Sequence, residues 1–377
     1  MIKKKNIFGG LKTIIWARCS RLFNKPIKPK VIAYSVTWRC NAKCFMCGLR
    51  TMPNSKKDIN SELTASDINR AFKDRALNSL DLIRFTGGEP FLKDDFTEII
   101  NAIWKNARPK LFYITTNGTY TERIKKFVEF FRGKDINLNI QVSLDATNKV
   151  HDRIRGVPGI SKKAIETLRM LSEMRKTMPI NVGINQTITK ENLDEIDAVN
   201  QLARKLHIEH KIYVAVSSHE SNILSEGAKN FELELASKFS EEEIRHLYKK
   251  IRHIFNNGRK FKGMADVNRL WHLVENFLLT EEKNRVTKSG KITSLPCQAA
   301  FLYFRLMPNG DIMPCTLMPE VIGNLKSNSF SEIWHSKAAE RIRKKVRNCP
   351  GCWVECDIVP NFVYSWQVIK SFFKSLV

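Results

Sequence analysis

The sequence has no apolar run long enough to cross a membrane as a helix, and it has no recognisable secretion signal. A spanning helix needs about 18 or more consecutive apolar residues, whereas charged residues interrupt the apolar stretches of this chain. Lys12 and Arg18 break the apolar stretch near the basic amino terminus, and no small-residue cleavage site follows it. Internal repeats and low-complexity tracts are also missing. We therefore expect a cytoplasmic protein, with the inner surface of the membrane as the alternative place of action.

Acidic residues are scarce relative to basic ones. The chain of 377 residues has 38 Asp and Glu against 63 Lys and Arg, which gives a formal net charge of +25. Such an excess favours anionic partners, such as phosphates, nucleic acid or a lipid surface, without choosing among them. Hydrophobic residues at 43% and charged residues at 27% are globular values and exclude a disordered or fibrous chain. The length exceeds what one hydrophobic core usually serves, so we expect two domains or one domain with extensions.

Cysteine is absent between residues 47 and 297, although the chain holds nine cysteines. Three lie near the start, and a second group occupies the last quarter, at Cys297, Cys315, Cys349, Cys352 and Cys356. An odd number without a secretion signal argues against a disulfide framework, and clustered thiols in a reducing compartment are typical of metal ligands. Cys19 stands apart, and we interpret it as a small apolar filler on a helix face.

Apolar runs alternate with helical patterns between residues 31 and 217. The expected strands are 31–37, 80–85, 111–115, 138–144, 180–187 and 212–216, and the expected helices are 64–77, 94–107, 121–131, 161–174, 191–206 and 240–256. Thr64 with Asp67 is a capping signature for the first helix, and Pro109 is a stop signal for the second. Six βα units predict an α/β fold with a parallel sheet, closed or partly closed. In such folds functional residues gather at the carboxyl ends of the strands.

The two ends and the last quarter of the chain differ from the rest in composition and in the pattern of their apolar residues. Residues 1–30 hold nine positive charges and no acid, and after Pro296 short apolar runs and cysteines are typical of a small metal-stabilised module. The carboxy-terminal segment has apolar residues at helical spacing, namely Phe362, Trp366, Ile369, Phe373 and Leu376. We therefore divide the chain into a basic amphipathic segment (1–30), a core barrel (31–240), a helical connection (241–294), an auxiliary cluster domain (295–358) and an amphipathic tail (359–377).

The first cysteine group, Cys40, Cys44 and Cys47, follows the end of the first expected strand in the pattern C-x3-C-x2-C. Three thiolates are too few for a closed structural zinc site, which takes four ligands. A 4Fe–4S cubane held by three cysteines leaves one iron open for a substrate or cofactor, and soft thiolates suit iron–sulfur chemistry. A zinc site completed by a distant ligand stays open as the alternative.

Together with the residues after the second strand, this pattern resembles the radical S-adenosylmethionine (SAM) enzymes, whose hallmark is this cysteine spacing after the first strand of a partial (β/α)6 barrel. The residues in question are Gly87, Gly88, Glu89 and Pro90, similar to the glycine-glycine-glutamate-proline motif of that family. Two glycines let the backbone close on a ligand, and a carboxylate there can hold an ammonium group. The resemblance implies that this segment binds SAM and that the three cysteines hold a [4Fe–4S] cluster.

Two further segments resemble cofactor-binding parts of the same family. Ser143 and Asp145 close the fourth expected strand, where family members meet the ribose and carboxylate of the cofactor. The stretch 151–156 is similar to the one in which an arginine approaches the cofactor carboxylate, and Arg155 is the better match within it. A solvated arginine is the alternative interpretation of Arg155.

Three other features bear less directly on the resemblance. An Asn-Gly turn at 116–118 ends the third strand and is equally well explained by its conformation. Asn185 and Thr187 on the fifth strand could face the adenosine, although buried polar residues of strands often only satisfy their neighbours. The position before the third cysteine is commonly aromatic in the family, and here it is Met46.

The second cysteine group also resembles a known element. Its spacing, with Gly-Asn-Leu at 323–325 and Ile-Trp at 333–334, is similar to SPASM, an auxiliary iron–sulfur extension of many radical enzymes that modify peptides and other large substrates. Five cysteines suffice for one [4Fe–4S] cluster, for which the expected ligands are Cys297, Cys315, Cys349 and Cys352. Cys356 is spare or replaces one of the last pair. A structural zinc site formed by four of the five is the alternative.

The resemblance implies a partial (β/α)6 TIM-like barrel with a small C-terminal iron–sulfur cluster domain. It further implies reductive cleavage of SAM to a 5′-deoxyadenosyl radical, which abstracts a hydrogen atom from a peptide or a carbohydrate- or lipid-linked substrate. The outcome would be oxidation, epimerisation or cross-linking. The alternative hypothesis is a zinc-stabilised protein without enzymatic activity that binds an anionic polymer.

Partners follow from the same resemblance and from the charge. An electron donor such as flavodoxin or ferredoxin is expected, whereas nucleic acid is not, because no RNA-binding module is evident. The basic amphipathic ends either associate with a membrane surface or pack on the barrel with their apolar faces inward.

Overall fold

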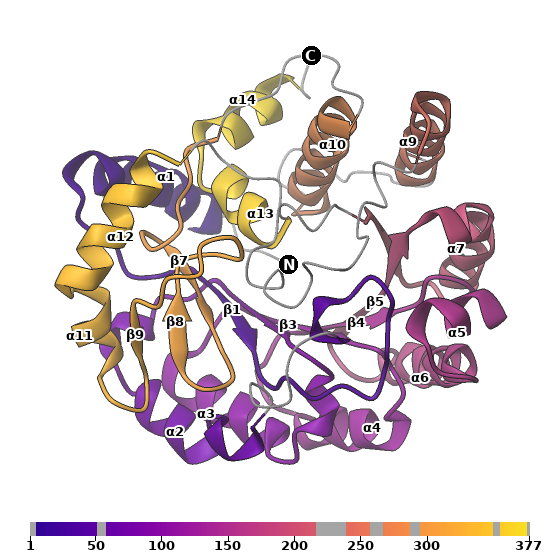
Figure 1. The fold of residues 1–377 in the computed structure, drawn as a ribbon, viewed down its shortest axis with the longest axis horizontal. Coiled ribbons are helices and arrows are strands. Elements are labelled where there is room, and N and C mark those ends of the chain that lie inside the picture. Colours follow the sequence, from indigo (N-terminus) through magenta and orange to yellow (C-terminus); the bar gives the residue numbers. More distant parts are fainter. Residues whose placement is uncertain are drawn as a thin grey trace.

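The computed structural model describes residues 5–50, 58–215, 239–256, 267–286, 295–349 and 355–374. In these ranges nine strands form one sheet, flanked by helices (Figure 1). The first six strands are parallel: β1 (Val31–Ser35), β2 (Leu82–Thr86), β3 (Leu111–Thr116), β4 (Leu138–Ser143), β5 (Ile180–Ile188) and β6 (Glu209–Val214). The predicted α/β class with a parallel, partly closed sheet is therefore confirmed.

One face of this sheet packs against helices, because every second residue of its strands is apolar and points to that face. Ile83, Phe85, Phe112 and Ile114 belong to the same core as the apolar side of the third helix, including Ile103. The helices on this side are α2 (Ala65–Ala71), α3 (Phe96–Ala107), α4 (Thr121–Phe130), α5 (Lys149–Arg155), α6 (Ile160–Met174) and α7 (Ile196–Lys205). Successive residues of a strand point to opposite faces. The alternate residues of the same strands therefore form the inner face of the sheet, opposite these helices.

The helix signals in the sequence are partly confirmed. Thr64 caps α2 with a reciprocal capping box to Asp67, which satisfies two backbone N–H groups at the start of the helix. α3 ends at Ala107, followed by Arg108 in the left-handed conformation and then Pro109. The expected helix 64–77 is shorter than predicted, because α2 ends at Ala71 and a 3-10 turn (Arg75–Leu77) follows. The short helix α5 was not predicted.

The sheet continues beyond the barrel strands. β7 (Tyr303–Leu306) pairs in parallel with β1, and β8 (Asp311–Met313) and β9 (Gly323–Asn324) add antiparallel strands at that edge. Helix α11 (Phe330–Trp334) packs on these strands through the buried Phe330 and Trp334 beside Phe304. Helix α12 (Lys337–Arg347) follows it and adds Ile342 and Val346 to the same core. The proposed division at residue 295 therefore does not coincide with a break in the sheet.

The remaining helices surround the other side of the molecule. They are α1 (Lys5–Phe23), α9 (Glu241–Asn256), α10 (Val267–Val286), α13 (Glu355–Val363) and α14 (Trp366–Lys374). Ile14 of α1 shares a small apolar cluster with Val274, Val359, Phe362 and Val368. Figure 1 shows α10, α13 and α14 on the side of the sheet opposite α2 and α3.

The two predicted amphipathic ends differ in how far they pack. Phe362 is fully buried and Ile369 is partly buried, whereas Trp366 is exposed. The side chain of Phe373 and all of Leu376 lie outside the described residues. The carboxy-terminal segment thus uses much of its apolar face inside the protein. No helix in the part of the chain that is described combines the length and the apolar character that a membrane span requires.

Candidate functional site

The loop that carries the first three cysteines is bound to the Gly-Gly turn after β2. The N–H of Gly88 donates to the carbonyl of Thr37 at 2.7 Å, and the N–H of Glu89 donates to that of Arg39 at 2.8 Å. A Cβ atom at position 88 would lie 1.8 Å from the Arg39 carbonyl oxygen. Glycine is therefore required there for the two backbones to approach just before Cys40.

The other side of the cysteine loop is bound to the end of α5. The N–H of Lys43 donates to the Arg155 carbonyl at 2.8 Å, and that of Phe45 donates to the Ile154 carbonyl at 3.2 Å. Gly156 follows with φ of 66°, and a Cβ there would lie 2.7 Å from the Lys43 carbonyl oxygen. The cysteine loop is thus held between the β2 turn and α5, at the carboxyl end of β1.

Glu89 is buried and its carboxylate is engaged by the neighbouring strand. One oxygen accepts from the Phe91 N–H at 3.1 Å and the Thr116 hydroxyl at 2.7 Å, and the other accepts from the Asn117 N–H at 2.7 Å. Burial raises the pKa of Glu89 to about 7, although these donors oppose the shift. The oxygen that accepts only from Asn117 keeps capacity for one further donor.

The Asn-Gly turn after β3 also reaches the cysteine loop. The side-chain amide of Asn117 donates to Asn41 at 2.8 Å, and Asn41 donates to the Thr119 hydroxyl at 2.9 Å. Asn41 is the residue after Cys40. The turn therefore connects Glu89 with the cysteine loop. The sequence did not indicate this role, because an Asn-Gly pair is explained equally well by the conformation of a turn.

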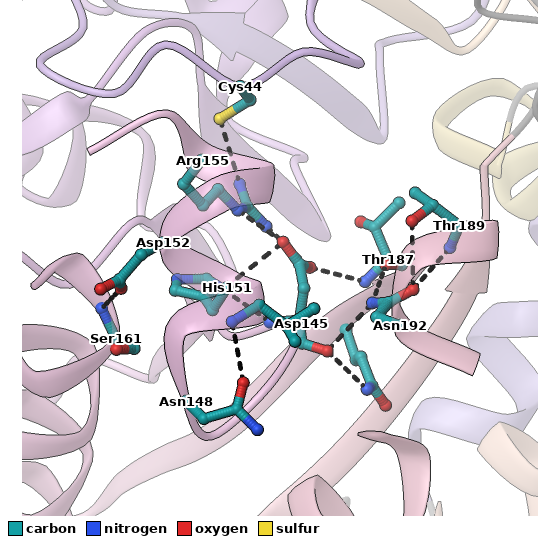
Figure 2. A network of polar contacts seen from close by, with 12 residues as sticks. Cys44, Asp145, Asn148, His151, Asp152, Arg155, Ser161, Thr187, Thr189 and Asn192 are labelled. Carbon is teal, nitrogen blue, oxygen red and sulfur yellow. Dashed lines mark hydrogen bonds and ion pairs between the residues drawn. The ribbon is translucent and has the colours of Figure 1, made fainter. Parts of the chain in front are cut away.

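Arg155 and Asp145 form a buried bidentate ion pair (Figure 2). Nε of Arg155 donates to one Asp145 oxygen at 2.7 Å, and Nη2 donates to the other at 3.0 Å. The third nitrogen, Nη1, lies 3.7 Å from the sulfur of Cys44. Burial alone would raise the pKa of Asp145, but Arg155 and His151 lower it to about 2. The same Asp145 charge, with that of Cys44, raises the pKa of Arg155 against the effect of burial.

Further hydrogen bonds fix Asp145 itself. Its N–H donates to Nδ1 of His151 at 2.9 Å, and its carboxylate accepts from the Thr187 N–H at 3.0 Å. Its carbonyl accepts from the amides of Gln186 and Asn192, each at 2.9 Å (Figure 2). Asp145 thus orients Arg155 towards Cys44, and its own carboxylate is occupied by protein groups.

Ser143, the last residue of β4, is the register partner of Asn185 within β5, and both are buried. The side-chain oxygen of Asn185 is buried and has no hydrogen-bond partner among the residues that the structure describes. Thr187 takes part through its backbone, which holds Asp145. Of these three, Asn185 is the one with a buried acceptor that a bound molecule could use.

Glu62 is a buried residue of this region that the sequence did not single out. It accepts from the Thr37 hydroxyl at 2.5 Å and lies 3.4 Å from Nζ of Lys93 and 3.8 Å from Arg39. It therefore supports the residues that precede Cys40. The signal was missing because Glu62 lies in a polar loop without a motif, and its partners come from two other segments, residues 37–39 and Lys93.

The second cysteine group is partly described. Cys297, Cys315 and Cys349 lie close enough to influence one another, since hydrogen bonding to Cys349 and burial raise the pKa of Cys297, and Cys315 adds to this effect. Cys352 lies outside the described residues, and so does the side chain of Cys356 in α13. The loops are tied together near these residues, because Asp357 accepts from the Thr316 N–H at 3.0 Å.

A residue of α1 also contacts this group. The guanidinium of Arg21 donates to the carbonyls of Cys297 and Arg347 and lies over the ring of Phe301. In the described ranges no three His, Cys, Asp or Glu side chains are gathered as a site for a single metal ion. Both cysteine groups offer thiolates as their donors, which fits iron–sulfur clusters.

Comparisons with known proteins agree with this geometry. The family model of the radical SAM superfamily matches residues 34–203, and that of SPASM, an iron–sulfur cluster-binding domain, matches residues 297–357. An AdoMet-dependent heme synthase of Methanosarcina barkeri is 25% identical over 322 residues, which are 84% of this chain and 84% of that protein.

Two further similar proteins come from peptide pathways. The subtilosin biosynthesis protein AlbA of Bacillus subtilis is 24% identical over 83% of this chain, and the match spans only 61% of AlbA. The structure of Streptococcus suis SuiB bound to the precursor peptide SuiA is 16% identical with a TM-score of 0.59, over 90% of this chain and 71% of SuiB. The latter likeness shows the shared fold.

The fold and the two matched domains define an enzyme that uses SAM and iron–sulfur clusters. The chain belongs to the radical SAM superfamily and carries a SPASM domain. These domains imply a SAM-binding [4Fe–4S] cluster and an auxiliary cluster. The alternative of a zinc-stabilised protein without enzymatic activity is therefore wrong, because the relatives are synthases and maturases.

Proposed function

We propose that this enzyme removes a hydrogen atom from a peptide substrate and so modifies the peptide. The convergence of the cysteine loop, the Gly-Gly turn and the Arg155–Asp145 pair at the strand ends carries the radical SAM part of this proposal. The peptide part is supported by the biosynthesis role in the name of AlbA and by the precursor peptide in the SuiB structure. Oxidation, epimerisation and cross-linking all fit this chemistry.

Cys40, Cys44 and Cys47 are the proposed ligands of the SAM-binding cluster. The guanidinium of Arg155 beside Cys44 supports this assignment, since it places a positive charge next to one of the three sulfur atoms that would carry the negative charge of the cluster. For the auxiliary cluster the proposed ligands are Cys297, Cys315, Cys349 and Cys352, with Cys356 as spare or substitute. The closeness of the first three supports the set.

The proposed SAM-binding residues are Gly87, Gly88, Glu89, Pro90, Ser143, Asp145 and Arg155. When bound, the reduced cluster would donate the electron that cleaves SAM, and the 5′-deoxyadenosyl group released as a radical would accept a hydrogen atom from an unreactive C–H bond. Glu89 would accept a hydrogen bond from the cofactor ammonium with its less occupied oxygen. Asp145 would act through Arg155, because its own carboxylate oxygens already accept from Arg155 and the Thr187 N–H.

A second candidate is a step of heme synthesis. The M. barkeri heme synthase matches over most of both chains, whereas the match to AlbA leaves more than a third of AlbA uncovered. A carbohydrate- or lipid-linked substrate is the remaining alternative, and its only support is the basic α1. In each case a flavodoxin or ferredoxin would supply the electron.

We also propose that the enzyme works at an anionic membrane surface through α1. Five of the nine exposed large hydrophobic side chains in the described residues lie on this helix, namely Leu11, Ile15, Trp16, Leu22 and Phe23. Lys12 and Arg18 on the same helix are exposed as well. Exposed apolar residues beside basic ones suit the boundary between head groups and acyl chains.

The experiment for the main proposal uses anaerobically reconstituted enzyme with dithionite and candidate precursor peptides encoded nearby. The enzyme should form 5′-deoxyadenosine, and a peptide should change in mass or in stereochemistry with matching stoichiometry. Replacing Cys40, Cys44 and Cys47 together with Ala should abolish 5′-deoxyadenosine while iron of the auxiliary cluster remains. If the triple variant still cleaves SAM, the ligand assignment is wrong. If porphyrin substrates are converted and peptides are not, heme synthesis replaces the peptide proposal.

A further inference from the structure

The guanidinium of Arg155 lies between the carboxylate of Asp145 and the sulfur of Cys44 (Figure 2). Its Nε and Nη2 donate to the two oxygens of Asp145 at 2.7 and 3.0 Å, and its Nη1 donates to the sulfur of Cys44 at 3.7 Å. Hydrogen bonds to the sulfur ligands are among the features that set the reduction potential of an iron–sulfur cluster. The arginine therefore bears on the cluster itself as well as on the cofactor that the cluster binds.

The backbone holds Arg155 and Cys44 next to each other. On one side of Cys44 the N–H of Lys43 donates to the Arg155 carbonyl at 2.8 Å, and on the other side the N–H of Phe45 donates to the Ile154 carbonyl at 3.2 Å. Both acceptors belong to the last turn of α5. The arginine and the cysteine are thus parts of one hydrogen-bonded unit, so their separation does not depend on the long arginine side chain alone.

Asp145 keeps the guanidinium in this orientation. Its carboxylate also accepts from the Thr187 N–H at 3.0 Å, and its own N–H donates to Nδ1 of His151 at 2.9 Å. The Asp145 side chain is fully buried and that of Arg155 is 12% exposed. The charges of Asp145 and Cys44 raise the pKa of Arg155 against the effect of burial. The positive charge beside Cys44 is therefore permanent and held in one place.

Cys44 is the most enclosed of the three proposed ligands of the SAM-binding cluster. It is buried, whereas Cys47 is partly buried and Cys40 is exposed. Charges interact more strongly where water is excluded. Because reduction adds one negative charge to a cluster, a positive charge beside a buried sulfur ligand favours the reduced form. The Asp145 carboxylate acts in the opposite sense, but it binds the edge of the guanidinium that faces away from Cys44 (Figure 2).

We propose that Arg155, held in place by Asp145, raises the reduction potential of the SAM-binding cluster through its hydrogen bond to the sulfur of Cys44. The inference rests on the proposed function, in which Cys40, Cys44 and Cys47 hold this cluster, and it does not depend on the identity of the substrate. A guanidinium has five N–H groups. Three of them are used by Asp145 and Cys44, so two remain for a cofactor carboxylate. Arg155 can therefore act on the cluster and bind SAM with the same side chain.

The test is a redox titration of the reconstituted full-length enzyme without SAM, with dithionite as the electron source and the reduced clusters followed by electron paramagnetic resonance (EPR). In Arg155→Met the ratio of reduced to oxidised SAM-binding cluster at a given potential should fall about tenfold, which is about 59 mV for a one-electron couple. Asp145→Asn should shift the potential the other way, because it removes a negative charge and leaves the arginine beside the sulfur. Arg155→Lys keeps the charge without the planar guanidinium and should retain part of the wild-type potential.

Arg153→Met is the matched control, because Arg153 is an exposed arginine of the same helix and should leave the potential unchanged. The signal of the auxiliary cluster is taken from the variant in which Cys40, Cys44 and Cys47 are all replaced with Ala. If that variant keeps the signals of both clusters, the ligand assignment of the proposed function is wrong. The potential of the auxiliary cluster should be the same in the Arg155 and Asp145 variants as in the wild type.

Opposite shifts in Arg155→Met and Asp145→Asn would support the proposal, because exposure of the cluster to water would move both potentials in the same direction. Shifts of the same sign would overturn it. A potential that is unchanged in Arg155→Met without SAM would also overturn it and would leave Arg155 only its contact with the cofactor. If Arg155→Met does not retain its cluster, Asp145→Asn decides: a raised potential supports the proposal, and an unchanged or lowered one overturns it.

Discussion

Arg21 of α1 donates a hydrogen bond to the main-chain carbonyl of Cys297, a residue 276 positions further along the chain. The first helix lies outside both matched domains, yet it contacts an expected ligand of the auxiliary cluster. Arg21 also donates to the Arg347 carbonyl, just before Cys349. The side chain of Arg21 thus joins α1 to the segment that begins with Cys297 and to the segment that precedes Cys349.

Arg21→Met should therefore loosen the auxiliary domain. Hydrogen bonds made by a charged group contribute about 1.5–3 kcal/mol, and Arg21 is partly buried. Hydrogen exchange of residues 297–303 should become faster in the reconstituted enzyme. Arg18→Met, which changes an exposed arginine on the same helix, serves as the control. Equal exchange in both variants would show that Arg21 does not hold Cys297 in place.

Glu89→Gln should weaken SAM binding while iron content stays unchanged. The amide keeps the size of the side chain but places an N–H group towards the donors of Phe91, Thr116 or Asn117. Loss of a charge-assisted hydrogen bond should cost about 1.5–3 kcal/mol of binding free energy, measured by equilibrium dialysis. Because the pKa of Glu89 is about 7, wild-type affinity should rise between pH 6 and pH 8 as the carboxyl ionises. A flat profile identical to that of Glu89→Gln would contradict a role for the charge.

Asp145→Asn should destabilise the protein and weaken SAM binding without removing a cluster ligand. Breaking a buried ion pair by changing one partner costs about 3–5 kcal/mol, because the other charge stays buried and unpaired. The double variant Asp145→Asn/Arg155→Met should recover part of this loss in denaturant unfolding. Full additivity of the two single changes would show that the pair is not coupled.

The same pair predicts a dependence of stability on pH. The pKa of Asp145 is lowered in the folded protein to about 2, from an ordinary value of 3.8. Its contribution to the free energy of unfolding is therefore complete above about pH 4 and is lost as the pH falls towards 2. The difference between wild type and Asp145→Asn should be constant from pH 5 to 7 and should shrink below pH 4. A difference that grows on acidification would have the wrong sign for this pair.

Cys315→Ala should lower the iron content and loosen residues 295–349. A bound cluster joins segments that are far apart in the sequence, so its loss removes part of the free energy that holds them together. Cleavage of SAM without substrate should persist, because it needs only the cluster of the first three cysteines, whereas turnover should fail. Cys19→Ala, at an exposed cysteine outside both groups, is the control. Iron content unchanged by Cys315→Ala would exclude this residue as a ligand.

Replacing Trp16 and Phe23 with Ser should reduce association with anionic vesicles. Each basic residue near an anionic surface contributes about 1 kcal/mol, and the exposed aromatics add apolar burial. Co-sedimentation should fall at high salt, since charges are screened beyond about 8 Å at physiological ionic strength. The control replaces Ile59 and Val321, two exposed residues away from α1, with Ser. Equal binding to neutral and anionic vesicles, or none to either, would refute the membrane proposal.

The elements that the sequence predicts well are those encoded by neighbouring residues. The capping box of Thr64 and Asp67 and the Gly-Gly turn after β2 depend on a few adjacent positions, so their signals survive without tertiary information. Helix α5 was missed because five of its seven residues have charged or imidazole side chains, which leaves too little apolar periodicity. β6 begins at Glu209, before the expected residue 212, because pairing with β5 includes polar residues that interrupt the apolar run.

The sequence predicted which motifs form the candidate site, but it did not predict the contacts between their residues. The family resemblance identified Arg155 and Asp145 separately, but only the fold brings them into one ion pair beside Cys44. Arg84 and Lys211, which lie over the ring of Tyr113, were missed for a related reason. Arg84 lies within the run 80–85, which was interpreted as a buried strand, and Lys211 lies just before the expected strand 212–216. A single charged residue in or beside such a run has no local signal of what it faces.

The parallel pairing of β1 with β7 limits how this enzyme could be rebuilt. Four residue pairs, from Val31–Tyr303 to Tyr34–Leu306, join the strand that leads into the first cysteine loop to the strand that follows Cys297. A one-residue slip would turn Arg305 away from the inner face and expose Phe304. A chimaera in which the auxiliary domain is replaced by that of a relative would therefore have to keep this register. Otherwise the backbone N–H and C=O groups of β1 that pair with β7 would lose their partners. A change in either cluster-bearing portion that shifts this register would therefore also displace the other.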